Sequence, residues 1–180
     1  RLENRKRDLI DMWLALPQPE AEQERKEVFQ ILEGEEQIDL KAIEVIQCAE
    51  REVRLLASEE DLGRLYHSGS IDRLERLLKK NVDVKFLTND SPKSRFFAEK
   101  IKLPDARYAL SDVKELPTFI LVDQEQLLLV IRKNSRNGEK TARAKVAALW
   151  TNYEAFFKAL EKLFSELWGV DERLRVLSPH

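Results

Sequence analysis

The sequence predicts an α/β domain in which helices cover both faces of a mixed β-sheet, preceded by an N-terminal helix. Strand-like and helical patterns alternate from Val28 onward, as is typical of a sheet covered by helices. The strand-like segments are continuous apolar runs rather than alternating apolar and polar residues, which indicates strands buried on both faces. With 180 residues, the chain is long enough to build one such domain around a hydrophobic core.

The expected elements follow one another along the main domain, which we place at residues 28–169. Apolar runs predict strands at 28–32, 52–58, 82–88, 106–110, 118–123, 127–131 and 145–150. Apolar residues at helical spacing predict helices at 38–49, 59–66, 70–80, 93–101 and 152–168. Ser58 and Ser70 are expected to cap two of these helices. Residues 170–180 have little periodicity and are expected to form a C-terminal extension.

Residues 1–27 are expected to form a helical dimerisation segment and a linker. Apolar residues recur there in a seven-residue seam that predicts packing against the same helix of a second copy, as in a short coiled coil. Arg5 interrupts this seam, and Pro17 and Pro19 then end the helix. The seam residues are Leu2, Leu9, Met12, Trp13 and Leu16.

The composition limits the possible classes of protein. Hydrophobic residues make up 43% and charged residues 36%, with a net charge of −2, which indicates a globular chain and gives no reason for non-specific nucleic-acid binding. Apolar runs stay far below the ~20 residues that cross a bilayer, and no signal peptide is present, so we expect a cytoplasmic protein without membrane contact. The chain begins inside a helical pattern without an initiator methionine, which suggests a fragment.

The residues of metal and nucleophile chemistry are few. Two histidines, His67 and His180, and one cysteine, Cys48, allow no zinc-ligand spacing, and no glycine-rich phosphate loop is present. We therefore expect no metal or cofactor. Cys48 lies in an apolar pattern and is expected to be a buried structural thiol, and His67 is expected to lie on the surface at a helix end.

A basic stretch follows the strand at 127–131, with Glu139 as its single acidic residue. It predicts either a solvated loop between two strands, which we favour, or a loop that attracts anions near the ligand face of the sheet. Its cations are Arg132, Lys133, Arg136, Lys140, Arg143 and Lys145.

Polar residues at two strand ends are further candidates. Trp150, Thr151 and Asn152 end one strand, where they could line a pocket or could simply pack in the core and cap the last helix. Asp123 ends another strand and opens the tight connection to the next one, where aspartate is favoured as a turn residue.

The order of the segments "EVIQCAEREV", "LERLLKKNVDVKFLT", "LPTFILVDQEQLLLVI" and "ALWTNYEAFFKALEKLFSELW" resembles the archaeal TrmB-type transcriptional regulators. In that family a DNA-binding winged helix-turn-helix precedes a helical, dimer-forming segment and a phospholipase D-like domain. The resemblance implies a homodimer that contacts DNA through a domain upstream of Arg1. It also implies a possible effector, either a sugar, a nucleotide or a phosphate, near Thr118, Asp123 and Asn152. Sugar-sensing members carry a further β-rich domain that follows this region.

The same resemblance bears on catalysis. Active phospholipase D-like enzymes use a His-x-Lys-x4-Asp motif, in which histidine attacks phosphorus, lysine holds a phosphate oxygen and aspartate orients the histidine. Alignment of its aspartate with Asp123 places Leu116 and Thr118 at the histidine and lysine positions, so the resemblance implies a protein that is not an enzyme. Two alternatives stay open: a residual phosphodiesterase, and an architectural dimer without a small-molecule ligand.

Overall fold

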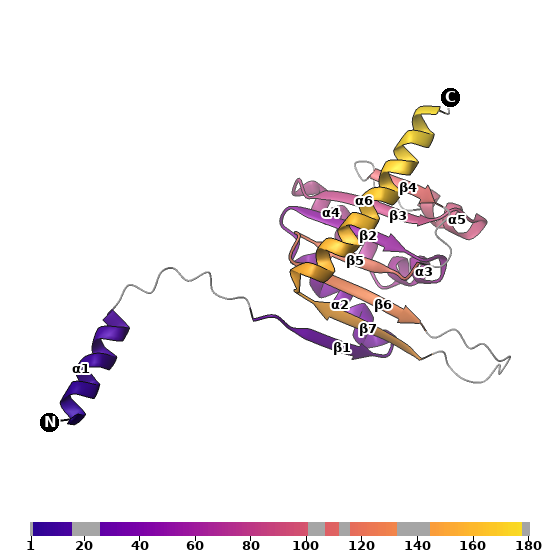
Figure 1. Cartoon of the computed structure of the whole chain (residues 1–180). Helices are drawn as coiled ribbons and strands as arrows, with labels where there is room; N and C mark the ends of the chain where they lie inside the picture. The colour runs from indigo at the N-terminus through magenta and orange to yellow at the C-terminus, as the bar shows by residue number, and fades with distance from the viewer. Residues whose placement is uncertain (1, 16–25, 101–106, 112–115, 133–144, 178–180) are drawn as a thin grey trace.

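A seven-stranded mixed sheet forms the centre of the fold, in the order β1-β7-β6-β5-β2-β3-β4 (Figure 1). The computed structural model describes residues 2–15, 26–100, 107–111, 116–132 and 145–177. The strands are β1 (Phe29–Glu33), β2 (Glu52–Ala57), β3 (Asp83–Asn89), β4 (Arg107–Ser111), β5 (Phe119–Val122), β6 (Gln126–Arg132) and β7 (Val146–Thr151). The helices are α1 (Leu2–Ala15), α2 (Glu35–Gln47), α3 (Glu59–His67), α4 (Ser70–Lys79), α5 (Pro92–Lys100) and α6 (Glu154–Leu177).

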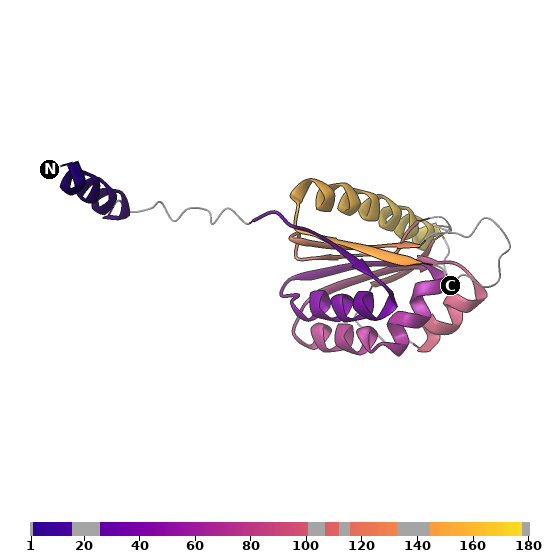
Figure 2. The same cartoon turned by 90° about the horizontal axis from the view of Figure 1, so that it is seen from below.

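The sheet is mixed because its two halves are connected differently. Strands β2, β3 and β4 are parallel and are joined by helices, whereas β5, β6, β7 and β1 pair antiparallel with their neighbours. Figure 2 shows α6 on one face of the sheet and helices α2 to α5 on the other. The predicted mixed sheet with helices on both faces is therefore confirmed.

Two hydrophobic cores result from the alternation of side chains along each strand. Within β2, Val53 and Leu55 point to the larger core beneath α2, α3 and α4, and Leu56 points to the smaller core beneath α6. In the smaller core, the α6 side chains Phe164 and Trp168 stack at 5.9 Å and pack on Phe119 and other residues of the sheet. Both faces of the central strands are thus buried, as their continuous apolar runs predict.

Three details differ from the sequence predictions. Cys48 is exposed, because it follows the end of α2 and lies off the buried stripe formed by Ala42, Val45 and Ile46. Gly69, not Ser70, caps α4, because the tight connection from α3 needs its positive φ of 86°. The last helix does not end at residue 168: α6 continues to Leu177, since its sequence contains no proline before residue 179.

Helix α1 stands apart from the sheet and its helices in both views (Figures 1 and 2). Among the predicted seam residues, Leu9 and Met12 are exposed on its surface. The side chains of Leu2 and Trp13, and the whole of Leu16, lie outside the described residues, so dimerisation through this seam stays a prediction. None of the helices, as far as they are described, is long and apolar enough to span a bilayer.

Candidate functional site

The residues expected to hold a ligand lie at the two opposite ends of the central strands, and we call each of these strand ends an edge of the sheet. Thr118 precedes β5 and Asp123 follows it, so about 16 Å of extended chain separates them. The pairing of Leu127 with Thr151 places the end of β7 at the same edge as Asp123. The structure therefore does not bring Thr118 together with Asp123 and Asn152, because extended strand separates the two ends of β5, and a ligand bound at all three stays a prediction.

Asp123 anchors the backbone at its edge of the sheet. Its buried carboxylate accepts hydrogen bonds from the amides of Glu50, Arg51 and Glu52 at 2.7–2.8 Å, and its carbonyl oxygen accepts one from the Arg51 guanidinium. With φ of 54° at Asp123 and 57° at Gln124, it also forms the predicted turn. Asp123 thus ties the hairpin to the start of β2 and cannot orient a group at position 116 or 118.

The side chains at the end of β7 also have structural partners. The Asn152 side chain accepts a hydrogen bond from the Val28 amide and donates one to the Lys26 carbonyl, which fixes the entry into β1. Trp150 donates its indole N–H to Gln126, and the Thr151 hydroxyl accepts the Tyr153 amide at the start of α6. Thr151 is therefore the residue that caps the last helix, whereas Asn152 holds the start of β1. The Trp150 ring also lies 4.4 Å from the Lys41 ammonium.

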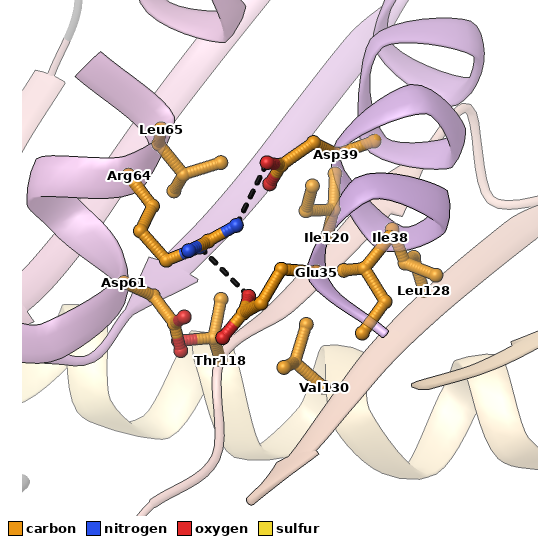
Figure 3. Close-up of a pocket in the computed structure, with 11 residues that line it drawn as sticks. Glu35, Ile38, Asp39, Asp61, Arg64, Leu65, Thr118, Ile120, Leu128 and Val130 are labelled. Carbon is orange, nitrogen blue, oxygen red and sulfur yellow. Dashed lines mark hydrogen bonds and ion pairs between the residues drawn. The ribbon is translucent and has the colours of Figure 1, made fainter. Parts of the chain in front are cut away.

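A more enclosed site lies at the opposite edge, around Asp61 in the first turn of α3 (Figure 3). The Asp61 carboxylate accepts hydrogen bonds from the hydroxyls of Thr118, at 2.7 Å, and Ser58, at 3.0 Å. The Ser58 hydroxyl also caps α3 by accepting the Asp61 amide, as predicted for this residue. Thr118 therefore has a role at a site, although its partners differ from those expected.

Two arginines complete this site by bridging its carboxylates. Arg132, at the end of β6, donates to Asp61 and, at 2.8 Å, to Glu35. Arg64 of α3 pairs with Glu35 and with Asp39, both at 2.8 Å, and Figure 3 shows it between these two carboxylates of α2. We call Glu35, Asp39, Asp61, Arg64 and Arg132 the charged cluster. It connects α2, α3 and β6.

Arg132, one cation of the predicted anion-attracting loop, is already paired with the carboxylates of Asp61 and Glu35, and the loop itself stays a prediction. Lys145 is exposed just before β7. The other predicted cations, Lys133, Arg136, Lys140 and Arg143, lie outside the described residues.

Burial raises the pKa of the acids in the charged cluster, and pairing with the arginines lowers it. Burial by itself would raise the pKa of Asp61, but hydrogen bonds from Arg132, Thr118 and Ser58 outweigh it and lower that pKa. Burial raises the pKa of Asp39, and its pairing with Arg64 offsets this only in part. Although burial alone would lower the pKa of Arg132, its hydrogen bonds to Asp61 and Glu35 raise it, so the guanidinium stays charged.

The cavity within the charged cluster is small and acidic. Its volume is about 20 Å³, which is room for one water molecule and not for a sugar or a nucleotide. Ile38, Ile120 and Leu128 form its apolar wall. Three carboxylates face two guanidinium groups, so the net charge repels a phosphate unless a carboxylate becomes protonated or moves. Within the described part of the chain, no cluster of His, Cys, Asp and Glu side chains could hold a metal ion.

Sequence reasoning identified Thr118 but missed the acids and Arg64. The available signal was spacing: Asp61 and Arg64 lie three residues apart on one helix, and Glu35 and Asp39 lie four apart on another. Such spacing is common on solvated helices, so it did not by itself indicate a site.

Several solved structures have a similar fold. The archaeal chromatin protein TrmBL2, whose structure shows a novel mode of DNA binding, is 18% identical, with a TM-score of 0.61 over 92% of this chain and 61% of that chain. Nuc from Salmonella typhimurium, a phospholipase D family member, is 16% identical, with a TM-score of 0.59 over 80% of this chain and 95% of that chain. NucT from Helicobacter pylori is 12% identical, with a TM-score of 0.56 over 80% of this chain and 97% of that chain.

These similarities establish the fold. No protein-family model and no curated protein matches the sequence. This chain spans only 61% of the length of TrmBL2, and it covers almost the whole of Nuc. The expected phospholipase D-like fold is confirmed: the described domain is a mixed α/β domain of that type.

Asp123→Ala is expected to lower the free energy of unfolding by about 3 kcal/mol or more, because three amides lose their acceptor in a buried place. Asp123→Asn keeps one acceptor oxygen and tolerates positive φ, so it should lose clearly less. Urea denaturation of the two variants and the wild type measures the difference. Equal stability of Asp123→Ala and the wild type would contradict the anchoring role.

Asp61→Asn tests the charged cluster through its pH dependence. Because the pKa of Asp61 is lowered below its usual 3.8, the charged carboxylate stabilises the fold above that pH, and this contribution is lost as the pH falls through the lower folded-state value. The variant should therefore be less stable than the wild type at neutral pH, and the gap should close from about pH 5 downward. Denaturant unfolding at a series of pH values measures this gap. Asp90→Asn, at an exposed pair with Arg95, is the control and should show a small gap throughout.

Proposed function

We propose that the chain is the dimerising and effector-sensing part of a DNA-binding transcriptional regulator, built on a phospholipase D-like domain that performs no catalysis. The observation that carries this proposal is which residues occupy positions 116 and 118. Leu116 and Thr118 stand where the resemblance places a histidine nucleophile and a lysine cation, and leucine carries no nucleophile and threonine no positive charge. Thr118 donates instead to Asp61.

The electrostatics of this edge support the same proposal. A phosphoryl-transfer site needs positive charge aimed at the developing negative charge of the phosphate. In the charged cluster, Arg132 and Arg64 both point at carboxylates of the protein itself. A phosphodiester would have to separate these arginines from the carboxylates, and buried Asp61 would then lose its charged partner, which is unfavourable.

The proposed mechanism uses the dimer. The seam of α1, with Leu9 and Met12 exposed, would pair two copies and set the spacing of two upstream DNA-binding domains on a two-fold-related operator. An effector that enters the charged cluster would have to separate Arg64 from Glu35 and Asp39, and so move α2 relative to α3. Such an effector shifts the dimer geometry only by the difference in its affinity for the two arrangements.

A second candidate is an architectural protein that coats DNA and senses nothing. The specific observation in its favour is the similarity to TrmBL2, a chromatin protein, over 92% of this chain. The small cavity of about 20 Å³ also fits this candidate, because it has no room for a sugar or a nucleotide in the described arrangement.

We expect no phosphodiesterase activity. Incubation of the protein with bis(p-nitrophenyl) phosphate and with single-stranded DNA should release no more product than buffer does, because leucine stands at the position of the nucleophilic histidine. His67→Ala is the informative variant, since His67 is the only histidine among the described residues. Turnover that scales with wild-type protein and disappears in His67→Ala would revive the enzyme alternative.

A thermal-shift screen with sugars, nucleotides and inorganic phosphate separates the sensor from the architectural protein. A ligand at a hundred times its Kd adds about 2.7 kcal/mol of stability, which for a chain of this size raises Tm by several degrees. If the sensor site is the charged cluster, Arg64→Gln should abolish this shift, whereas Arg95→Gln, at an exposed pair, should keep it. The absence of any shift across the screen would favour the architectural protein. A shift that persists in Arg64→Gln would place the effector elsewhere.

A further inference from the structure

Helix α6 covers only part of its face of the sheet. It packs mainly on β2, β4, β5 and β6, and Figure 1 shows β1 and much of β7 beside it rather than beneath it. The pairing register places Phe119, Leu129, Leu149 and Ile31 in one row across four neighbouring strands. Phe119 is fully buried, Leu129 and Leu149 are partly buried, and Ile31 is 65% exposed. Apolar side chains thus continue beyond the edge of the helix.

Other side chains on the same face extend this apolar surface. Ile131 alternates with Val130, which is buried in the opposite core, so Ile131 points to the α6 side, where it is exposed. Phe29 alternates in the same way with residues of β1 that point to the other core, and it is also exposed. A soluble monomer rarely leaves such a contiguous apolar area uncovered.

Helix α6 presents a second apolar stripe toward this uncovered area. Phe156, Leu160, Leu163 and Leu167 follow one another at intervals of four, three and four residues, which is the a/d spacing of a coiled coil. Phe156 is exposed and the three leucines are partly buried, beside the fully packed stripe that contains Phe164. The ring of Phe156 meets that of Phe29 edge-on at 5.4 Å, so the second stripe faces β1.

The stripe and the uncovered strands together form an apolar groove, whose wall is α6 and whose floor is β6, β7 and β1. Three neighbouring strands span about 10 Å, because strands lie about 4.8 Å apart, and an α-helix is about 10 Å across. The floor therefore has room for one further helix beside α6. That helix would need an apolar stripe of its own for the floor and for the a/d stripe of α6.

We propose that the occupant of this groove is helix α6 of a second copy of the chain. Each copy contributes the same surface to the interface. Its α6 offers the a/d stripe, and the strands beside α6 offer the floor that receives the stripe of the other copy. A two-fold axis that runs parallel to the two α6 helices brings their stripes together and sets each helix beside the floor of the other copy, as an isologous interface requires. Ala159 lies next to the stripe, where its small side chain allows the two helices to approach closely. The two sheets then enclose the helix pair.

This interface deepens the dimer of the proposed function, because it joins the sheet domains independently of the α1 seam. The experiment therefore uses the full chain with both Leu9→Asp and Met12→Asp, because these two substitutions prevent α1 from pairing through its apolar seam. Sedimentation velocity should still give twice the mass of 21.1 kDa. Ile31→Lys and Phe156→Glu are then added one at a time. Lysine suits an edge strand and glutamate suits the first turn of a helix, so both variants should fold.

Each added substitution should weaken the dimer about tenfold or more, because it places a charge in the apolar groove. Leu40→Lys and Phe96→Glu are matched controls: both residues are exposed to a similar degree, 61% and 52%, and lie on α2 and α5, on the other side of the sheet. These controls should stay dimeric, and circular dichroism checks the fold of every variant.

Two results overturn the inference. If the variant of the α1 seam is already monomeric, α1 alone holds the dimer, and the dimer of the proposed function stands without the groove. If that variant is dimeric and the groove substitutions weaken it no more than the controls do, the second copy binds elsewhere. A monomeric wild-type chain contradicts both interfaces.

Discussion

The buried carboxylate of Asp61 is the interaction on which the edge of the sheet at Thr118 depends. It lies in the first turn of α3 and takes its donors from Thr118, before β5, and from Arg132, at the end of β6. Arg132 in turn reaches Glu35 at the start of α2. A buried charge without partners is costly, so these four segments hold their positions together. The two guanidinium groups at this edge are thus paired with carboxylates of the protein itself.

The order of elements could be predicted because its signals are local. A continuous apolar run such as 119–122 indicates a central strand, and a four-residue apolar stripe on 70–80 indicates a helix against a sheet. The caps and turns that were predicted correctly also rest on near neighbours: Ser58 accepts the amide three residues later, and Asp123 occupies a turn that favours aspartate. Gly69 replaced Ser70 as a cap because the required positive φ depends on where the previous helix ends.

The candidate site could not be predicted in the same way, because its contacts join distant parts of the chain. Thr118 and Asp61 lie 57 residues apart in sequence, Arg132 and Glu35 lie 97 apart, and the Asp123 carboxylate reaches Arg51 72 residues away. A motif written along one strand suggested that residues 118 and 123 act together. The extended backbone between them places these two residues at opposite edges. Arg132 was assigned to a basic loop for the same reason: its neighbours in sequence are cations, whereas its neighbours in space are carboxylates.

Strand β6 connects the charged cluster with the groove that we assign to a second copy. Its successive residues Ile131 and Arg132 point to opposite faces of the sheet, the first into the groove and the second to Asp61 and Glu35. A ligand that separates Arg132 from these carboxylates would release the end of β6, and the floor of the groove includes this end. Because a packed interface has few alternative arrangements, a small shift there changes how two copies fit. Sensing on one face and association on the other would then be coupled by a single strand, without any contact between effector and partner.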